Sequence, residues 1–290
     1  MSKWPAGPAG GALGVGEKRE TFRELHRSGC FVIPNPWDIG SARYLAHLGF
    51  KALATTSSGF AWSRGRSDND MTLDEVLRHL EEMAASVDVP VNADFEGGFA
   101  AEPAGVEANV RRAVATGVAG LSIEDSTGDA SAPLHEFGLA VERVRAAAAA
   151  VAGTGVTLVA RSEGFIAGRP HLAETVRRLT AYAEAGADCL YAPGIRTREE
   201  ITAVVRAVAP KPVNVLVGSD FTTVAEMASL GVRRISVGGA LARAAWAGFV
   251  RAAGELARTG TFAGFASALP SAELEGLFKH VRGSTHPEDR

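Results

Sequence analysis

Residues 113–125 read AVATGVAGLSIED, and this stretch contains the unit that decides the fold of the whole chain. An alanine-rich helical run ends at Gly117, a short apolar strand begins near Gly120, and the strand ends in Glu124 and Asp125. A glycine at such a position supplies the left-handed residue that ends a helix and turns the chain into a sheet. The stretch therefore predicts a helix, a turn and a strand with a polar carboxyl end.

The same order of helix, glycine and strand recurs along the chain, for example at Gly49, Gly186 and Gly231. Short β-rich runs alternate with longer segments of helical periodicity. The predicted strands cover residues 30–35, 52–58, 91–96, 120–126, 157–163, 188–193, 212–218 and 234–239. The predicted helices cover residues 39–48, 72–86, 104–116, 137–152, 171–185, 198–208, 222–230 and 241–258.

Eight such units in about 250 residues predict an α/β fold, a (β/α)8 TIM barrel. A doubly wound parallel sheet would share much of this pattern and is the alternative. We expect residues 1–17 to form a flexible N-terminal tail, residues 18–260 the catalytic barrel, and residues 261–290 a C-terminal helical extension and tail. The extension carries an apolar stripe at near-helical spacing, which one barrel does not obviously need. The stripe consists of Ala272, Leu274, Leu277, Phe278 and Val281.

Composition excludes several classes of function. The net charge is -3, and no run of lysine and arginine is long enough to follow a phosphate backbone, so nucleic acid is not an expected partner. The first 17 residues lack the apolar core of a signal peptide, and no apolar stretch is long enough to span a membrane. Cys30 and Cys189 cannot build a disulfide framework and fit a reducing compartment. We therefore expect a soluble, cytoplasmic protein with no membrane partner.

Catalytic groups of such a barrel lie at the carboxyl ends of its strands, and here those ends are polar. Residues two apart in a strand share a face, so Asp94 and Glu96 point one way, as do Arg161 and Glu163. Clustered carboxylates suit Mg2+ or Mn2+ rather than zinc. An arginine beside them can hold an anionic substrate. The strand ends therefore predict a metal site that also binds an anion.

Two loop residues have both a structural and a functional interpretation. Asp68 either initiates the helix that begins near Thr72 or joins the site. His135, in the loop after the fourth predicted strand, is either a surface histidine or a catalyst. Arg161 itself can be an ion-pair partner of Glu124 and still bind substrate.

Six motifs occur in order along the chain and together are specific. They are Asn35-Pro-Trp-Asp-Ile-Gly-Ser-Ala-Arg43, Thr55-Thr-Ser-Ser-Gly-Phe-Ala61, Gly65-Arg-Ser-Asp68, Asn92-Ala-Asp-Phe-Glu-Gly-Gly98, Ile123-Glu-Asp-Ser126 and Ala160-Arg-Ser-Glu-Gly-Phe165. From about residue 30 to residue 245 the chain resembles the isocitrate lyase/phosphoenolpyruvate mutase superfamily. That resemblance implies a barrel that binds Mg2+ and a 2-oxo or 2-hydroxy carboxylate and reacts through a pyruvate-like enolate. It also implies a homotetramer or homodimer that packs or exchanges C-terminal helices.

The resemblance assigns roles to individual residues. Asp94 would be the principal metal carboxylate, Glu96 and Glu124 would act directly or through water, and Asp68 would join the outer metal sphere. Arg161 would contact the substrate carboxylate and the enolate oxygen, beside a carboxylate-binding turn. The catalytic candidates are Arg161, Thr56, Ser57 and His135. The substrate-binding candidates are Trp37, Thr56, Ser57, Ser58, Arg161, Tyr191 and Asn214. The group that protonates the enolate stays open among His135, Tyr191 and a water molecule.

Departures from the superfamily pattern narrow the chemistry. Isocitrate and methylisocitrate lyases carry a cysteine acid in the loop after strand four, and carbon–phosphorus enzymes place a lysine after the Glu-Asp pair. This chain has Ser126 there and neither a cysteine nor a lysine before His135. We therefore expect an oxaloacetate decarboxylase or a related carbon–carbon lyase. The alternatives are a phosphoenolpyruvate mutase or phosphonopyruvate hydrolase, a phosphate-ester enzyme with a cradle at Gly218-Ser219 and Gly238-Gly239, and a non-catalytic carboxylate-binding barrel.

Overall fold

The computed structural model describes the backbone of residues 13–282, and its strands form one parallel sheet. The sheet order is β1-β8-β7-β6-β5-β4-β3-β2, so the first and last strands are neighbours. The N–H of Ala54 donates to the carbonyl oxygen of Pro34 (3.1 Å), which links β2 to the end of β1. A nearly closed barrel therefore forms, as predicted, and the doubly wound alternative is wrong. The strands are β1 (Phe31–Ile33), β2 (Leu53–Ala54), β3 (Val91–Asp94), β4 (Gly120–Glu124), β5 (Thr157–Arg161), β6 (Cys189–Tyr191), β7 (Val213–Leu216) and β8 (Arg234–Ser236).

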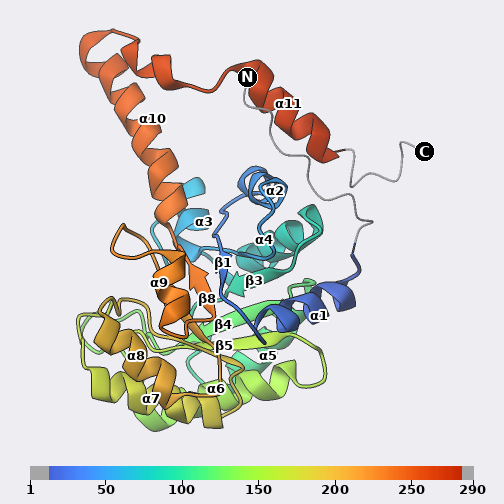
Figure 1. The fold of residues 1–290 in the computed structure, drawn as a ribbon, viewed down its shortest axis with the longest axis vertical. Helices are drawn as coiled ribbons and strands as arrows, with labels where there is room; N and C mark the ends of the chain where they lie inside the picture. Colours follow the sequence, from blue (N-terminus) through green and yellow to red (C-terminus); the bar gives the residue numbers. More distant parts are fainter. Residues whose placement is uncertain (1–12, 283–290) are drawn as a thin grey trace.

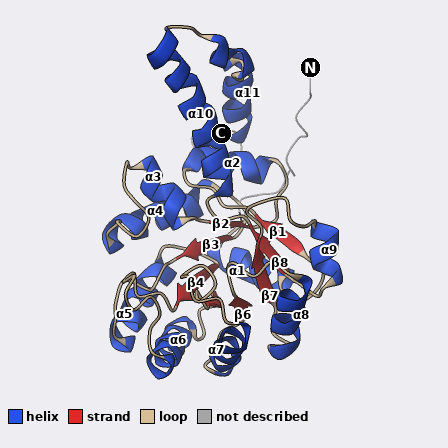
Figure 2. Ribbon diagram, turned by 90° about the vertical axis from the view of Figure 1, so that its left-hand side faces the viewer, coloured by secondary structure: helices blue, strands red, loops and turns tan. Residues whose placement is uncertain are grey.

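The helices surround the barrel, as Figures 1 and 2 show. Every predicted helix is present within two residues of its predicted ends. The predicted helices appear as α2 (Ile39–His47), α4 (Leu73–Ser86), α5 (Pro103–Ala115), α6 (Phe137–Val151), α7 (Leu172–Glu184), α8 (Arg198–Ala207), α9 (Val224–Ser229) and α10 (Ala240–Thr259). The structure adds α1 (Val15–Leu25), α3 (Ser57–Ser63), the short 3-10 helix η1 (Ala263–Ser267) and α11 (Ser271–Arg282).

Most strands are shorter than predicted, and two predicted segments need a specific correction. The strand predicted for residues 52–58 is a strand only at Leu53–Ala54, because Thr56 caps α3 by accepting the N–H of Gly59 (3.4 Å). The tail predicted for residues 1–17 extends too far, because α1 begins at Val15. Residues 1–12 lie outside the described part of the chain.

Helix α1 packs at the amino-terminal end of the barrel. The ring of Phe22 is fully buried among Ile33, Ala52 and Ala119. A methyl group on Gly120 would lie only 2.5 Å from Phe22 Cε1, so this position requires glycine. The amino end is thereby filled with apolar side chains, and the polar carboxyl ends of the strands remain available for chemistry.

The C-terminal extension forms an arm beside the barrel (Figure 1). Helix α10 projects outward, and its Phe249 is 61% exposed. Helix α11 returns toward α2, where Leu277 is buried and the ring of Phe278 approaches Gly40. The side chain of Val281, the last residue of the predicted stripe, lies outside the described residues. The predicted extension is thus helical, and its exchange between subunits stays a prediction.

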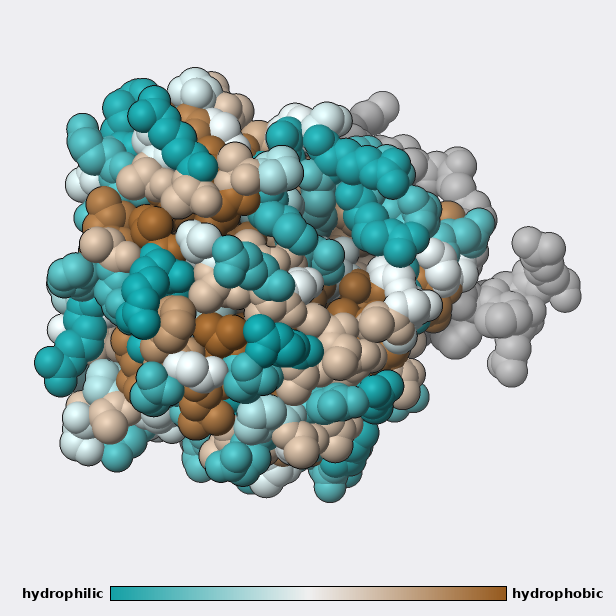
Figure 3. Space-filling view, turned by 90° about the horizontal axis from the view of Figure 1, so that it is seen from below, coloured by the Kyte–Doolittle hydropathy of each residue, from teal (hydrophilic) through white to brown (hydrophobic). Residues whose placement is uncertain are grey.

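The outer surface is mixed in character. On the face opposite α10 and α11, hydrophilic and hydrophobic side chains are interspersed (Figure 3). Among the described helices, none combines the length and apolarity that crossing a bilayer requires.

Candidate active site

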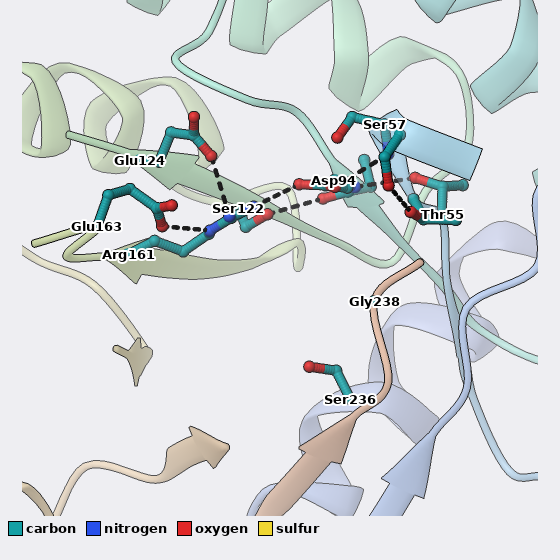
Figure 4. Close-up of polar contacts among 12 residues, drawn as sticks. Thr55, Ser57, Asp94, Ser122, Glu124, Arg161, Glu163, Ser236 and Gly238 are labelled. Atoms are coloured by element: carbon teal, nitrogen blue, oxygen red, sulfur yellow. Dashed lines mark hydrogen bonds and ion pairs between the residues drawn. The ribbon is translucent and has the colours of Figure 1, made fainter. Parts of the chain in front are cut away.

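Asp94 ends β3 and is held by two residues of the turn that follows β2. Its N–H donates to Thr55 Oγ1 (2.9 Å), and its Oδ2 accepts the N–H of Ser57 (3.0 Å). The start of α3 therefore fixes the carboxylate of Asp94 (Figure 4). This contact occupies the backbone N–H of Ser57, which is therefore not available to a substrate.

Arg161 ends β5 and lies among three carboxylates. Its Nη1 is 2.6 Å from Asp94, its Nη2 is 3.1 Å from Glu124, and its Nε is 2.9 Å from Glu163. Burial would lower the pKa of Arg161, but the three carboxylates raise it well above its usual value. The guanidinium is therefore permanently charged and held in one orientation by these contacts, which Figure 4 draws as dashed lines.

A second group of buried side chains holds Glu163 in place. Asp125 Oδ1 accepts the N–H of Glu163 (2.8 Å). Its Oδ2 accepts the hydroxyl of Tyr182 (2.7 Å) and Nη1 of Arg178 (3.0 Å). Two residues of α7, Arg178 and Tyr182, thus position Glu163 through Asp125.

The acidic residues around Arg161 carry more negative charge than one guanidinium neutralises. Burial, with Asp94 and Asp68 nearby, raises the pKa of Glu96 to about 8. Burial, followed by the charge of Asp94, raises the pKa of Asp68. Burial likewise raises the pKa of Glu124 well above its usual value. Glu96 also has a left-handed backbone (φ 47°), a conformation that is costly outside glycine and is frequent at functional sites.

These carboxylates fit a divalent cation only in part. Within residues 13–282, no three acidic, histidine or cysteine side chains converge on one metal position. Arg161 lies between Asp94 and Glu124 and occupies the space between them. Burial first and the charge of Asp94 next raise the pKa values of both Glu96 and Asp68, and a cation at Asp94 would offset that charge. The set therefore fits Mg2+ held by Asp94, with the other carboxylates reached through water.

A cavity of about 160 Å³ opens beside this cluster. It is smaller than the clefts of about 300–1,000 Å³ that take drug-sized ligands, and so it suits a small anion. Many of the predicted site residues line it. They are Thr56, Ser57, Ser58, Asp68, Asp94, Arg161 and Tyr191.

Other predicted residues lie outside the cavity wall. Trp37 packs against Gly59 of α3. Asn214 is fully buried within the barrel and bonds other side chains. His135 is held at the base of its loop, where its N–H donates to Asp125 and its carbonyl accepts from Arg178. None of these three residues lines the cavity, and their roles in catalysis and substrate binding stay predictions.

The cavity also contains residues that the sequence did not single out. Ser122 and Arg234 are such residues, and Ser236, the polar end of the eighth strand, lines the cavity as well. Alternation along β8 could have revealed Arg234, because it lies two residues before Ser236 and shares its face. Asn35 Oδ1 accepts the N–H groups of Val237 (2.9 Å) and Gly238 (2.8 Å). The predicted phosphate cradle thus lacks its Gly238 donor, which argues against the phosphate-ester alternative.

The pattern of the phosphoenolpyruvate phosphomutase family matches residues 22–257. The chain belongs to this family. A solved structure of a candidate lyase/mutase from Burkholderia cenocepacia is 47% identical, with a TM-score of 0.88 over 91% of this chain and 97% of that one. The oxaloacetate decarboxylase of Bradyrhizobium diazoefficiens is 31% identical over 66% of this chain and 68% of its own.

A third family relative was solved with a ligand. A phosphonopyruvate hydrolase in complex with oxalate and Mg2+ is 27% identical, with a TM-score of 0.79 over 94% of this chain and 99% of that one. Relatives in this family are lyases and mutases, which identifies the chain as an enzyme of this kind. The expected superfamily is thereby confirmed.

Proposed function

We propose that this protein is a Mg2+-dependent carbon–carbon lyase for a small 2-oxo or 2-hydroxy carboxylate, with oxaloacetate as the leading substrate. The observation that carries the proposal is the contact of Arg161 with Asp94, Glu124 and Glu163 at the edge of a small polar cavity. A fixed cation beside a carboxylate cluster favours a reaction in which negative charge develops on a bound oxygen.

Each group of residues around the cavity would have its own role in the proposed reaction. The hydroxyl groups of Thr56, Ser57 and Ser58 would orient the substrate carboxylate, since they line the cavity beside Asp94. Arg161 would stabilise the oxygen on which charge builds as the carbon–carbon bond breaks. Mg2+ bound at Asp94 would supply a second positive charge at that oxygen. Mn2+ has similar ligand preferences and is the alternative ion.

The loop after β4 bears on the choice between carbon–carbon and carbon–phosphorus chemistry. It contains neither cysteine nor lysine, and it is closed by an antiparallel bridge between Ser126 and Leu134. Decarboxylation needs an electron sink more than a specialised acid, so the residues present suit it. Similarity to an oxaloacetate decarboxylase supports this proposal, and similarity to a phosphonopyruvate hydrolase defines the rival that a test must exclude.

The test compares the wild type with Asp94→Asn at equal Mg2+ concentration, because free Mg2+ alone decarboxylates oxaloacetate slowly. We expect pyruvate release from oxaloacetate by the wild type only, competitive inhibition by oxalate, and poor turnover of isocitrate, methylisocitrate and phosphonopyruvate. Equal rates for the two proteins would refute the decarboxylase assignment. Efficient phosphonopyruvate turnover would establish the rival, and tight oxalate binding without turnover of any 2-oxo acid would indicate a non-catalytic barrel.

A further inference from the structure

Arg234, the first residue of β8, is a buried cation inside the barrel. It is 2% exposed, and it lines the cavity. Its Nε donates to Asn214 Oδ1 (2.9 Å) and its Nη1 to Asn92 Oδ1 (3.4 Å), so both of these partners are neutral amides. A buried charge without a carboxylate among its hydrogen-bond partners is costly. Such a group calls for a functional explanation.

The hydrogen bonds from Arg234 run in one direction. A guanidinium can only donate, so it fixes the amide of Asn214 with Oδ1 toward Arg234. The Nδ2 of Asn214 therefore faces the other way and donates to Ser236 Oγ (2.9 Å). Ser236 and Tyr191 both line the cavity, and the hydroxyl group of Ser236 lowers the pKa of Tyr191, as a donor directed at the phenolic oxygen does. Since Ser236 Oγ already accepts from Asn214, its own proton is available for the phenolic oxygen of Tyr191.

Tyr191 follows Ser236 in this series of polar side chains and lies at the wall of the cavity. It ends β6 next to Arg161, with which it is paired in register, and the guanidinium carbon lies 5.2 Å from the ring centroid. Because the phenolic oxygen accepts from Ser236, the phenolic proton is free to point into the cavity. Burial raises the pKa of Tyr191 to about 12, so the phenol carries its proton at neutral pH.

We propose that Tyr191 donates its phenolic proton to the carbon of the substrate-derived enolate, and that Ser236, Asn214 and Arg234 position the phenol for this step. The proposal rests on the proposed function, because it requires an enolate at this site. His135 was a rival donor from the sequence, but Tyr191 lines the cavity and His135 does not.

The proton transfer is balanced. The O–H bond of Tyr191 breaks as a C–H bond forms at the enolate carbon, with the electron pair supplied by the enolate double bond. The enolate oxygen becomes a carbonyl oxygen, and negative charge passes to the phenolic oxygen. That charge is stabilised by the donor from Ser236 and by the nearby guanidinium of Arg161. Solvent returns the proton after the product leaves.

The test uses pyruvate rather than a cleavable substrate. By microscopic reversibility, the group that protonates the enolate also removes a methyl proton from bound pyruvate. We expect the Mg2+-loaded wild type to exchange the methyl protons of pyruvate for deuterium in D2O, followed by NMR. Tyr191→Phe should slow this exchange at least about 100-fold, the usual contribution of a general acid–base group. Its affinity for oxalate, measured by calorimetry, should be unchanged.

Two further variants distinguish the effect of losing the proposed hydrogen bonds from the effect of a substitution as such. In Asn214→Asp both side-chain oxygens accept, so Ser236 donates to residue 214 instead of Tyr191. We expect about 10-fold slower exchange from the loss of that one hydrogen bond, with oxalate binding retained. Tyr44→Phe makes the same chemical change on α2, outside the cavity wall, and should exchange pyruvate at the wild-type rate.

Each outcome decides between the two proposals. Equal exchange by the wild type and Tyr191→Phe overturns the role of Tyr191, as does a parallel loss of oxalate binding in that variant. Oxaloacetate turnover without pyruvate exchange by the wild type also overturns it and leaves the decarboxylase proposal intact. If exchange depends on Tyr191 but the protein does not turn over oxaloacetate, the role of Tyr191 as proton donor is supported and oxaloacetate is refuted as the substrate.

Discussion

Arg161 Nη1 lies 2.6 Å from Asp94 Oδ1, so the residue expected to bind substrate is paired with the residue expected to bind the metal. A divalent ion bound at Asp94, as proposed, would compete with the guanidinium for the same carboxylate. Arg161 would then keep Glu124 and Glu163 as partners and could turn one nitrogen toward a substrate oxygen. The proposed metal binding would thus be coupled to the substrate contact of Arg161.

The first prediction concerns the metal. Asp94→Asn should abolish turnover and weaken Mg2+ binding measured by calorimetry, because it removes the principal anionic ligand. EDTA should inactivate the wild type reversibly. Asp74→Asn is the matched control, since Asp74 pairs with Arg112 at the exposed surface of α4. Full activity after exhaustive chelation would contradict the metal assignment.

The second prediction concerns Arg161. Arg161→Ala should lower kcat by about 100- to 1,000-fold, as does the loss of other groups that stabilise a developing oxyanion. The affinity for oxalate should fall much less, because the interaction strengthens as charge develops. Arg145→Ala removes an exposed arginine that pairs with Glu142 and should leave kinetics unchanged. An effect of Arg161→Ala on KM alone would show that the arginine only binds the ground state.

The third prediction concerns pH. The pKa of Glu96 is about 8 in the folded protein against 4.5 in an unfolded chain, so the folded state retains a proton between these values. Stability of the metal-free protein, measured by thermal unfolding, should therefore fall as pH rises from about 4.5 through 8. Mg2+ affinity should rise over the same window, as the carboxylate becomes charged. Glu96→Gln should flatten both profiles, and Glu107→Gln, at the exposed surface of α5, should not.

The fourth prediction concerns assembly. The arm that follows the barrel exposes Phe249, Phe262 and Leu269, each by more than half. Exposed apolar surface of this kind marks an interaction site. We predict a homotetramer or homodimer that buries this arm, and deletion of residues 270–290 should dissociate it. A wild-type monomer in light scattering at micromolar concentration would contradict the prediction, and Glu273→Gln on α11 serves as a control for substitution in the same helix.

The sequence was a good guide where the signal is local. A helix, a glycine and a strand are adjacent in the chain, so repetition of this unit was enough to predict the barrel. The barrel then required strand ends to meet, which brought Asp94, Glu124 and Arg161 to one site. Alternation along the fifth strand predicted that Arg161 and Glu163 share a face, and their side chains form an ion pair.

Boundaries and competing local bonds were less predictable. The turn after β2 contains residues that fit a strand, but Thr56 caps a helix there and Ser57 donates to Asp94. The bond from Ser57 to Asp94 is a tertiary contact with another strand, and sequence periodicity does not encode it. Helix α1 was missed for a related reason, because its helical state is stabilised by burying Phe22 beneath the barrel.

The sequence by itself determined the fold class, the family resemblance and the acidic strand ends, because these depend on spacing along one segment. Only the tertiary structure decided that Arg161 lies between Asp94 and Glu124, and that Arg234 bonds to Asn214, which bonds to Ser236 at the cavity wall. These contacts cross strands far apart in the sequence, and they depend on strand register and on the direction of each donor. A hydrogen bond forms only over a few tenths of an ångström and a narrow range of angles, so side-chain geometry had to be known before these contacts could be assigned.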